Sequence, residues 1–357
     1  MKSFICFTAG ILLFGSVIFS AQAAFTNLYV FGDGITTTTD NTSGLPFYLG
    51  QRYSNGRVWV EVLAQRQGLP YDPNKNWSYF GNTSTTMVAN VISFSITPSS
   101  ASNALFVIWV NCADLFYPAL YSGTSMAQWN SAINQSQTYH YKAVTNLYAK
   151  GVRTLIMPNA VDISTIPKFN TSDNVNFIHL RCLDYNIAFS NTLNRIRASC
   201  PNLTLYTPDF YALLTNILAH PANYTVTNAL YSGLSIDAID DPALSNKATN
   251  GPGANYIFWD STDPSGKVHS WMANTVQQLV SPARISQITA LKGSNRVVMA
   301  NVPVGQYGQV IGRTNLLLGN WTTNVNNINT TNPTQTVYVP ASGPQWFYRL
   351  KYLYSWP

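Results

Sequence analysis

Few side chains in this sequence have the type and spacing to carry chemistry. Four hydroxyls stand together at Thr36, Thr37, Thr38 and Thr39, and a thiol, Cys112, precedes Asp114 by two residues. A hydroxyl or thiol becomes a nucleophile only when a base or a depressed pKa activates it. Acidic rather than basic residues neighbour the thiol, and no histidine is close to the hydroxyls in sequence. We therefore expect a buried, inert thiol and hydroxyls that cap a helix or face solvent.

The histidines provide no obvious base. His140, His179 and His220 lie on or beside segments with helical patterns, where a histidine is more often a core or surface residue than a catalytic group. No Cys-x-x-Cys pair or Cys/His cluster indicates a metal site. We expect neither a metal nor a cofactor.

The composition indicates a folded protein of about two modules. The chain has 357 residues, of which 46% are apolar and 10% charged, so a large core can form. The net charge is +6, but basic residues are scattered, with no run longer than two. Because no nucleic-acid module is recognisable either, we expect no nucleic-acid partner.

The N-terminal segment has the pattern of a secretory signal peptide. Lys2 precedes an apolar run over residues 4–19, and Ala21-Gln22-Ala23 supplies a small-x-small cleavage site. The run is short for a membrane span, which is the competing interpretation. We expect residues 1–24 to be removed, leaving no integral span, and the mature protein to be secreted, periplasmic or located at the outer envelope.

Three cysteines remain after that removal, and an oxidising compartment permits one bridge. Cys182 and Cys200 are the candidate pair for this disulfide. The alternative is that both are buried thiols on one helix and never meet.

Residues 25–281 alternate between strand-like and helix-like segments. The apolar stretches over residues 25–31, 104–110, 154–157 and 203–206 predict strands. The segments over residues 58–67, 124–150, 175–198 and 208–218 predict helices. This alternation predicts an α/β domain with a parallel sheet covered on both faces.

The pattern changes after residue 281. Short strand-like segments at residues 284–291, 296–299, 307–311, 335–339 and 346–350 are separated by Gly, Pro and Asn, which predicts a small, sandwich-like all-β module over residues 282–357. We predict a loop for the polar segment 324–335. The module resembles C-terminal modules of some exported bacterial proteins in its Thr314-Asn315-Leu316, Asn320-Trp321-Thr322 and Phe347-Tyr348-Arg349-Leu350 stretches.

Five blocks, in order, resemble the GDSL/SGNH hydrolase family. Residues 31–35 read Phe-Gly-Asp-Gly-Ile, and residues 52–59 read Arg-Tyr-Ser-Asn-Gly-Arg-Val-Trp. Residues 76–81 (Asn-Trp-Ser-Tyr-Phe-Gly), 106–114 and 258–269 are similar to the later blocks. The resemblance covers about residues 26–280 and implies a flavodoxin-like, three-layer α/β/α fold and a carboxylic-ester hydrolase lineage.

The same resemblance implies that most of the catalytic groups are missing. Family members use a Ser nucleophile, an Asp-x-x-His pair, and an oxyanion hole made by the Ser N–H, a Gly N–H and an Asn side chain. Here the Ser position is Gly34, the Asn position is Ala113 and the His position is Asp263, while Asp260 and the oxyanion Gly81 remain. His269 is similar to a second, non-catalytic histidine of the last block.

The carboxylates are the remaining candidates for ligand binding. The resemblance implies that Asp33 and Asp114 brace loops through backbone hydrogen bonds, and that Asp263 lies beside Gly34 with Asp260 close by. Asp263 could then bind a cation or sugar hydroxyls, pair with Asp260 as acid and base, or simply cap the helix starting near Ser265. The ligand hypothesis includes a pocket of net negative charge.

Three functions fit these observations. The first is an exported ester hydrolase of the lipase/acylhydrolase kind, which the lost side chains oppose. The second is a pseudoenzyme, a non-catalytic protein that binds an ester, lipid, glycan or cation in the old cleft. The third is a structural protein of the envelope or matrix. The oligomeric state does not follow from the sequence.

Overall fold

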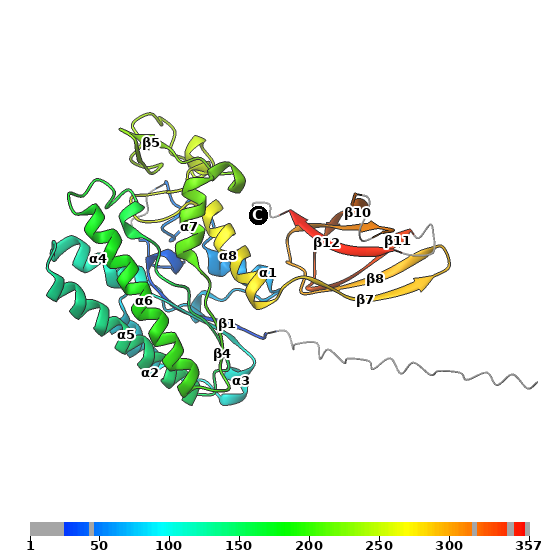
Figure 1. Ribbon diagram of the computed structural model, residues 1–357, viewed down its shortest axis with the longest axis horizontal. Coiled ribbons are helices and arrows are strands. Elements are labelled where there is room, and N and C mark those ends of the chain that lie inside the picture. The colour runs from blue at the N-terminus through cyan, green and yellow to red at the C-terminus, as the bar shows by residue number, and fades with distance from the viewer. Residues whose placement is uncertain (1–24, 43–45, 316–319, 341–345, 354–357) are drawn as a thin grey trace, which may run out of the picture.

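The computed structural model describes residues 25–42, 46–315, 320–340 and 346–353. The expected signal peptide, residues 1–24, lies outside this part. Figure 1 shows a layered α/β part that contains α1 to α8, and a separate group of strands, β7 to β12, to its right. Within the described residues, no helix is long and apolar enough to cross a membrane.

The α/β part is built on a parallel sheet in the order β1-β2-β3-β4. Its strands are β1 (Leu28–Gly32), β2 (Leu105–Trp109), β3 (Thr154–Ile156) and β4 (Thr204–Tyr206). Every residue of β2 is buried, because helices cover both faces of the sheet. A single parallel bridge between Val30 and Asn76 adds a rudimentary edge next to β1. With that edge the order is the expected flavodoxin-like one, so the predicted fold class is confirmed.

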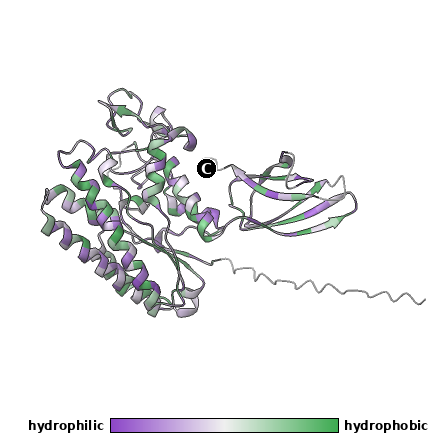
Figure 2. Ribbon diagram, viewed as in Figure 1, coloured by the Kyte–Doolittle hydropathy of each residue, from purple (hydrophilic) through white to green (hydrophobic). Residues whose placement is uncertain are grey.

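Helices form the outer two layers, and Figure 1 shows them on the two sides of the sheet. One group comprises α2 (Ser84–Ser93), α4 (Asn111–Tyr121), α5 (Met126–Ala149) and α6 (Val175–Ser199). The other comprises α1 (Trp59–Arg66), α7 (Phe210–Ala219) and α8 (Gly266–Val280), and the short α3 (Pro98–Ser102) precedes β2. Trp59, Trp109 and Phe210 pack edge to face between α1, β2 and α7. Figure 2 shows apolar and polar positions interleaved along these helices, as their half-buried setting requires.

Gly151 ends the long helix α5 for a steric reason. Its φ is +98°, and an added Cβ would lie 2.7 Å from the backbone of Pro98. Only glycine accepts both the left-handed backbone and the close approach. The predicted helix end at this residue is confirmed.

The C-terminal strands form two antiparallel sheets. One has the order β10-β9-β12 and the other β11-β8-β7. Their bounds are β7 (Arg284–Leu291), β8 (Ser294–Ala300), β9 (Tyr307–Arg313), β10 (Thr322–Asn329), β11 (Thr334–Pro340) and β12 (Phe347–Leu353). A second apolar cluster that includes Val297, Met299, Val310 and Val339 lies between them. The expected all-β, sandwich-like architecture is confirmed.

The loop predicted over residues 324–335 is wrong. β10 occupies much of it and pairs with β9 through two register shifts, and β11 begins at Thr334. The register shifts break the two-residue alternation that identifies a strand in sequence. Val325 and Ile328 are the apolar residues of this polar edge strand, and both contact the module's core, so its apolar signal is weak. A second element without a clear signal is the short hairpin β5 (Leu230–Tyr231) and β6 (Leu234–Ser235).

The expected disulfide is also wrong. All three cysteines of the described chain are free and buried. Cys182 lies in α6 and Cys200 is the residue that ends it, so eighteen helical residues put them about 27 Å apart. The alternative of two buried thiols on one helix is the one that holds.

Candidate functional site

The loop after β1 is held in shape by its own aspartate. Asp33 accepts a hydrogen bond from the backbone N–H of Ile35 at 3.2 Å and caps the short 3₁₀ turn Gly34–Thr36. Its carboxyl also accepts the N–H of Ala113, at the start of α4. The predicted bracing role is confirmed, because one carboxyl ties the loops at the ends of β1 and β2 together.

Asp114 braces a different pair of elements. Its Oδ1 accepts the N–H of Ser84 at the start of α2, at 2.9 Å. Its Oδ2 accepts the hydroxyl of Ser136 on α5, at 2.5 Å. Both oxygens are therefore used in packing α4 against α2 and α5. Asp114 is not among the residues that line the pocket described next, so the structure favours bracing over its candidacy as a ligand.

A pocket of about 240 Å³ opens at the carboxyl ends of β1 and β2. Gly34, Gly81, Ala113 and Asp263 all line it, together with Asp33 and Cys112. These are the positions expected for the nucleophile (Gly34), for two oxyanion-hole groups (Gly81 and Ala113) and for the base (Asp263). The fold thus brings together four distant blocks of sequence. Ligand sites of open α/β sheets lie in this place.

The pocket wall is otherwise apolar. Much of it comes from α4, whose large side chains Tyr117, Leu120 and Tyr121 are 65%, 46% and 71% exposed at its rim. Phe80 lies over the empty nucleophile position, because a Cβ built on Gly34 would be 3.1 Å from its ring. Phe80 is itself 53% exposed and can turn aside.

Asp260 and Asp263 belong to one tight turn. Asp260 Oδ1 accepts the backbone N–H groups of Thr262 and Asp263, at 2.9 and 2.8 Å. The Thr262 hydroxyl contacts both carboxyls, 3.0 Å from Asp260 Oδ1 and 2.6 Å from Asp263 Oδ2. The hydroxyl of Tyr48 donates to Asp260 Oδ2 at 2.9 Å. Asp260 is thus held by the turn, and Asp263 is the member that faces the pocket.

Asp263 does not cap the following helix. α8 has Ser265 as its N-cap with no side-chain capping bond. The N–H of Gly266 donates instead to the side-chain oxygen of Asn55, at 2.9 Å. The capping interpretation of Asp263 is therefore wrong, because the turn points its carboxyl toward Thr262 and away from the N-terminus of α8.

Burial changes the charge expected for this pocket. Burial raises the pKa of Asp33 to about 7. Burial, and then the charge of Asp260, raises the pKa of Asp263 well above its usual value of 3.8. The pKa of Asp260 is raised by burial too. Burial thus shifts these carboxyls toward their protonated forms and lowers the negative charge that the pocket carries near neutral pH. The expected net negative charge stays a prediction.

The remaining nucleophile candidates are not activated. The Thr36 hydroxyl donates to the backbone oxygen of Asp33 and to Ser78 Oγ, and none of the four threonines lines the pocket. Cys112 does line it, but burial and then the nearby charge of Asp33 raise the pKa of its thiol well above the usual value. The expectation of an inert thiol is confirmed.

Two histidines lie inside the protein and away from the pocket. The Nδ1 of His269 accepts the N–H of Trp59, 3.2 Å away, which is one of the donors that the first turn of α1 cannot satisfy itself. Burial lowers the pKa of His269 to about 3, so the ring is neutral. His140 lies 3.2 Å from the Ser136 hydroxyl beside Asp114, but both side chains are almost fully buried. Its Nδ1 is also within 2.9 Å of the backbone oxygen of Ser136, so His140, Ser136 and Asp114 form a packing cluster between α5 and α4.

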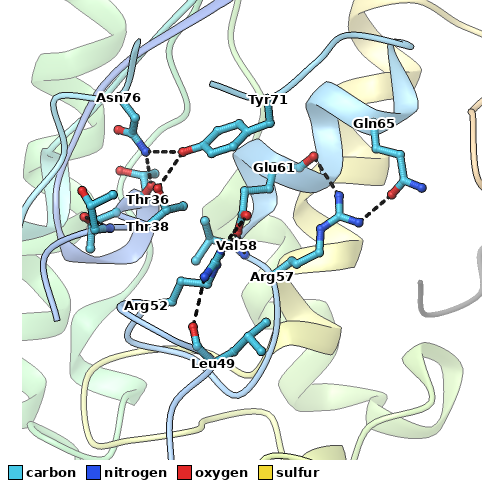
Figure 3. A network of polar contacts seen from close by, with 12 residues as sticks. Thr36, Thr38, Leu49, Arg52, Arg57, Val58, Glu61, Gln65, Tyr71 and Asn76 are labelled. Carbon is cyan, nitrogen blue, oxygen red and sulfur yellow. Dashed lines mark hydrogen bonds and ion pairs between the residues drawn. The ribbon is translucent and has the colours of Figure 1, made fainter. Parts of the chain in front are cut away.

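A polar network connects the loop after β1, α1 and the segment before Gly81 (Figure 3). Arg52 and Glu61 form a two-bond ion pair, with nitrogen–oxygen distances of 2.5 and 2.7 Å, and Glu61 also accepts the N–H of Val58 at 3.0 Å. Asn76 donates to the backbone oxygen of Thr36 and to the hydroxyl of Tyr71. These contacts join the loop after β1 to the block that carries Gly81.

Sequence reasoning missed several supporting residues. Phe80 and Thr262 line the pocket and Tyr48 holds Asp260, yet no pattern in the sequence assigns these roles. Asn55 and Glu61 lie within the block over residues 52–61, whose resemblance was the available signal. Within the described chain, no group of three or more His, Cys, Asp or Glu side chains is placed to hold a metal ion.

Comparison with known proteins places this geometry in a family. The profile described as "GDSL-like Lipase/Acylhydrolase" matches residues 28–276. The thermolabile hemolysin of Vibrio parahaemolyticus is 21% identical over 241 residues, which cover 64% of this chain and 55% of the hemolysin. The aligned part therefore spans only about half of that relative's length.

Solved structures with a similar chain path include esterases. An acetylxylan esterase from Geobacillus stearothermophilus is 14% identical, with a TM-score of 0.40 over 71% of this chain and 93% of that one. An alpha/beta hydrolase from the metagenome of Lake Arreo in Spain is 15% identical, with a TM-score of 0.41 over 73% of this chain and 97% of that one.

Proposed function

Because the chain belongs to the GDSL-like lipase/acylhydrolase family, we propose that it is an exported member that has lost ester hydrolysis and keeps the cleft as a binding site for an apolar, acyl-type ligand. The observation that carries this proposal is the composition of the pocket wall. Gly34 stands where the family's nucleophile belongs, and none of the residues that line the pocket is a histidine.

The loss of hydrolysis follows from what each missing group contributes. Without a nucleophile and a base, a serine-type site retains only about 10³–10⁴-fold acceleration over water. Removal of one oxyanion donor, here the Asn replaced by Ala113, costs about 2.7–4 kcal/mol more. Asp263 does not substitute for an imidazole base, since its Oδ2 already accepts the Thr262 hydroxyl at 2.6 Å within the same turn.

The class of ligand follows from the walls. The pocket is lined mainly by apolar and aromatic side chains, and burial raises the pKa of both carboxyls that line it, Asp33 and Asp263. A protonated Asp263 donates a hydrogen bond to a carbonyl oxygen and repels no apolar chain. An acyl compound with one carbonyl matches this arrangement better than a cation or a polyhydroxylated sugar, and better than the purely structural role, which needs no pocket.

The proposed export draws on the residues that precede the domain. Lys2, the apolar run over residues 4–19 and the Ala21-Gln22-Ala23 site have the order of a cleaved signal. Localisation of a tagged full-length protein, with and without residues 1–24, tests this part. Retention of the full-length form inside the cell would contradict it.

Restoration of the missing groups tests the loss of hydrolysis. The variant Gly34→Ser/Ala113→Asn/Asp263→His places a hydroxyl, an amide and an imidazole at the three positions that line one pocket. We expect the unmodified protein to hydrolyse p-nitrophenyl acyl esters no faster than background, and the triple variant to show hydrolysis with a burst of acyl-enzyme. Phe80 has to move by a few tenths of an ångström to admit the side chain introduced by Gly34→Ser, which its exposure permits.

The matched control is Gly34→Ala/Ala113→Asn/Asp263→His, which differs from the restored variant by one oxygen atom. We expect it to be inactive. If the unmodified protein hydrolyses the esters above background and this control does so as well, the proposed loss of hydrolysis is contradicted. A folded restored variant without any burst would show that these positions do not form the family's site.

A further inference from the structure

The charges of this protein are divided unequally between its two parts. Asp263 is the last acidic residue of the sequence, so residues 282–357 contain no Asp or Glu at all. The same segment holds six basic residues, Arg284, Lys292, Arg296, Arg313, Arg349 and Lys351. Residues 1–281 hold fourteen basic and fourteen acidic residues, so the whole net charge of +6 is carried by residues 282–357.

Three of the six basic residues share one face of the sheet β10-β9-β12. In the register of β9 and β12, Phe347 pairs with Arg313, Arg349 with Ile311 and Lys351 with Gln309. Directly paired residues point to the same side of a sheet, and side chains alternate along each strand. Tyr348, Leu350 and Tyr352 on the alternate positions of β12 pack on the module's core. Arg313, Arg349 and Lys351 therefore lie on the opposite, outward face.

An aromatic side chain fixes two of these charges. Trp321, directly before β10, has the guanidinium groups of Arg313 and Arg349 at 4.6 and 4.4 Å from its ring. Each contact is an attractive cation–π interaction. Two like charges that would repel each other are thereby held on a common ring, while Arg349 and Lys351 remain exposed to solvent. We call Arg313, Trp321, Arg349 and Lys351 the basic face.

The geometry of this face selects a polymer with repeating negative charge. Neighbouring strands are about 4.8 Å apart, and alternate residues of one strand are about 7 Å apart, so the charges form a closely spaced, nearly flat array. Phe347 and Tyr307 are on the same face, and Tyr307 is 54% exposed at its end. Flat aromatic rings beside cations suit the apolar faces and the anionic groups of sugar rings.

Other anionic partners fit less well. The face projects no helix or β-ribbon that could enter a groove of duplex DNA. Of the large exposed apolar side chains of the described module, Ile288, Leu291 and Tyr338 lie on β7 and β11 of the other sheet. Tyr307 alone of this set lies on the basic side, so no aliphatic wedge accompanies the charges toward a membrane. We propose that the basic face binds an anionic polysaccharide, a chain of carboxylated or sulfated sugars.

The test measures binding of the full-length protein to alginate and dextran sulfate, with neutral dextran as the reference, at several NaCl concentrations. We expect both acidic polymers to bind, more weakly as salt rises, and dextran not to bind. The double variant Arg349→Gln/Lys351→Gln should weaken binding by about tenfold. The single variant Lys351→Gln changes only an exposed side chain, cannot disturb the core, and should weaken binding about threefold.

The module supplies a matched control with the same change in net charge. Arg284 begins β7 and Lys292 is in the β7–β8 turn, both on the other sheet. Arg284→Gln/Lys292→Gln should alter binding by less than about twofold if the face, rather than net charge, is responsible. Equal losses in the two double variants would overturn the proposal, as would equal binding of dextran. Tighter binding of single-stranded DNA or of phosphatidylglycerol vesicles than of either acidic polysaccharide would reassign the face to that partner.

Discussion

Single residues decide the chemistry of this pocket. Gly34 supplies a backbone N–H but no hydroxyl, and Asp263 supplies a carboxyl at the position where the family resemblance predicts a base. The surrounding aspartates keep their structural duties, since Asp33 and Asp114 still tie the loops after β1 and β2 to their neighbours. Under the proposed loss of hydrolysis, the frame of the pocket is kept while the reacting groups change, because bracing and catalysis depend on different side chains.

Residue identities allowed the sequence to predict part of this and not the rest. The roles of Asp33 and Asp114 follow from blocks that determine backbone turns locally. The raised pKa of Asp263 does not, because it depends on burial and on Asp260, which is held by Tyr48 from a distant segment. Charge state is a property of the assembled environment, and no spacing rule reports it.

Asp33 predicts an unusual dependence of stability on pH. Its pKa is about 7 in the folded protein and near 3.8 otherwise, so between these values the folded state keeps a proton that the unfolded state has lost. The contribution of Asp33 to stability is complete below pH 3.8 and is lost as pH rises to 7, by at most about 1.4 kcal/mol per pH unit. Asp33→Asn removes this loss, so the variant should gain stability relative to the unmodified protein as pH rises from 4 to 7.

Urea unfolding of both proteins at pH 4.5, 5.5, 6.5 and 7.5 measures this difference. Asp72→Asn is a suitable control, because Asp72 is exposed and a backbone hydrogen bond from Asn74 lowers its pKa. Its contribution is lost as pH falls, so any trend in this control should be small and of the opposite sign. Parallel pH profiles of the Asp33→Asn variant and the unmodified protein would mean that Asp33 is ionised in the folded state.

At the scale of elements, α4 supplies much of the apolar pocket wall that the proposed acyl ligand would contact. Its side chains Tyr117, Leu120 and Tyr121 line the pocket and are partly exposed to solvent at the rim. We expect decanol and methyl decanoate to raise the melting temperature, and maltooligosaccharides and Ca²⁺ to leave it unchanged. Leu120→Ala should weaken decanol binding about fivefold, since several buried methyl and methylene contacts are lost.

Ile187→Ala is the control for this variant. Ile187 is an aliphatic residue of α6 that is 63% exposed and does not line the pocket, and the same truncation there should leave binding unchanged. An equal effect of both truncations would indicate nonspecific association of the ligands with exposed side chains. Stabilisation by the sugars instead of decanol would contradict the acyl ligand.

The elements themselves were predictable where an apolar period exists. β2 is a continuous run of buried residues, and α5 is followed by Gly151, whose left-handed backbone favours glycine at that position. β10 was missed because register shifts and a polar edge remove the period, and the disulfide failed because a helix separates its two cysteines. Local pattern reports elements with one buried face, whereas edges and pairings depend on neighbours distant in sequence.

At the scale of the whole molecule, the fold separates two surfaces with different charge. The pocket belongs to the part of the chain with balanced charge, and the basic face belongs to strands that contain no acidic residue. Nothing in the composition as a whole reveals this division, because a net charge of +6 is modest for 357 residues. The register of β9 and β12 is what turns scattered basic residues into one face.

The two parts of the chain meet at a buried arginine, which predicts how they unfold. Arg66, at the end of α1, is fully buried and donates to Asn274 on α8 at 3.2 Å and to the backbone oxygen of Val304 at 3.3 Å. The N–H of Val304 in turn donates to the backbone oxygen of Arg66, and an added Cβ on Gly305 would meet the side chain of Gln65. α1 is therefore packed directly on the loop between β8 and β9.

Arg66→Met keeps the apolar stem of the side chain but removes its donors, which leaves the two oxygens without a partner. We expect the variant to lose about 3 kcal/mol of stability, because buried hydrogen bonds to a charged group are each worth about 1.5–3 kcal/mol. Calorimetry should also resolve two transitions, since the α/β part and the strands after residue 281 then unfold independently.

Arg197→Met, an exposed change on α6, should leave one transition at its original temperature. A single transition in the Arg66→Met variant, shifted no further than in this control, would mean that the other contacts of α1 with residues 302–305 are enough to join the two parts.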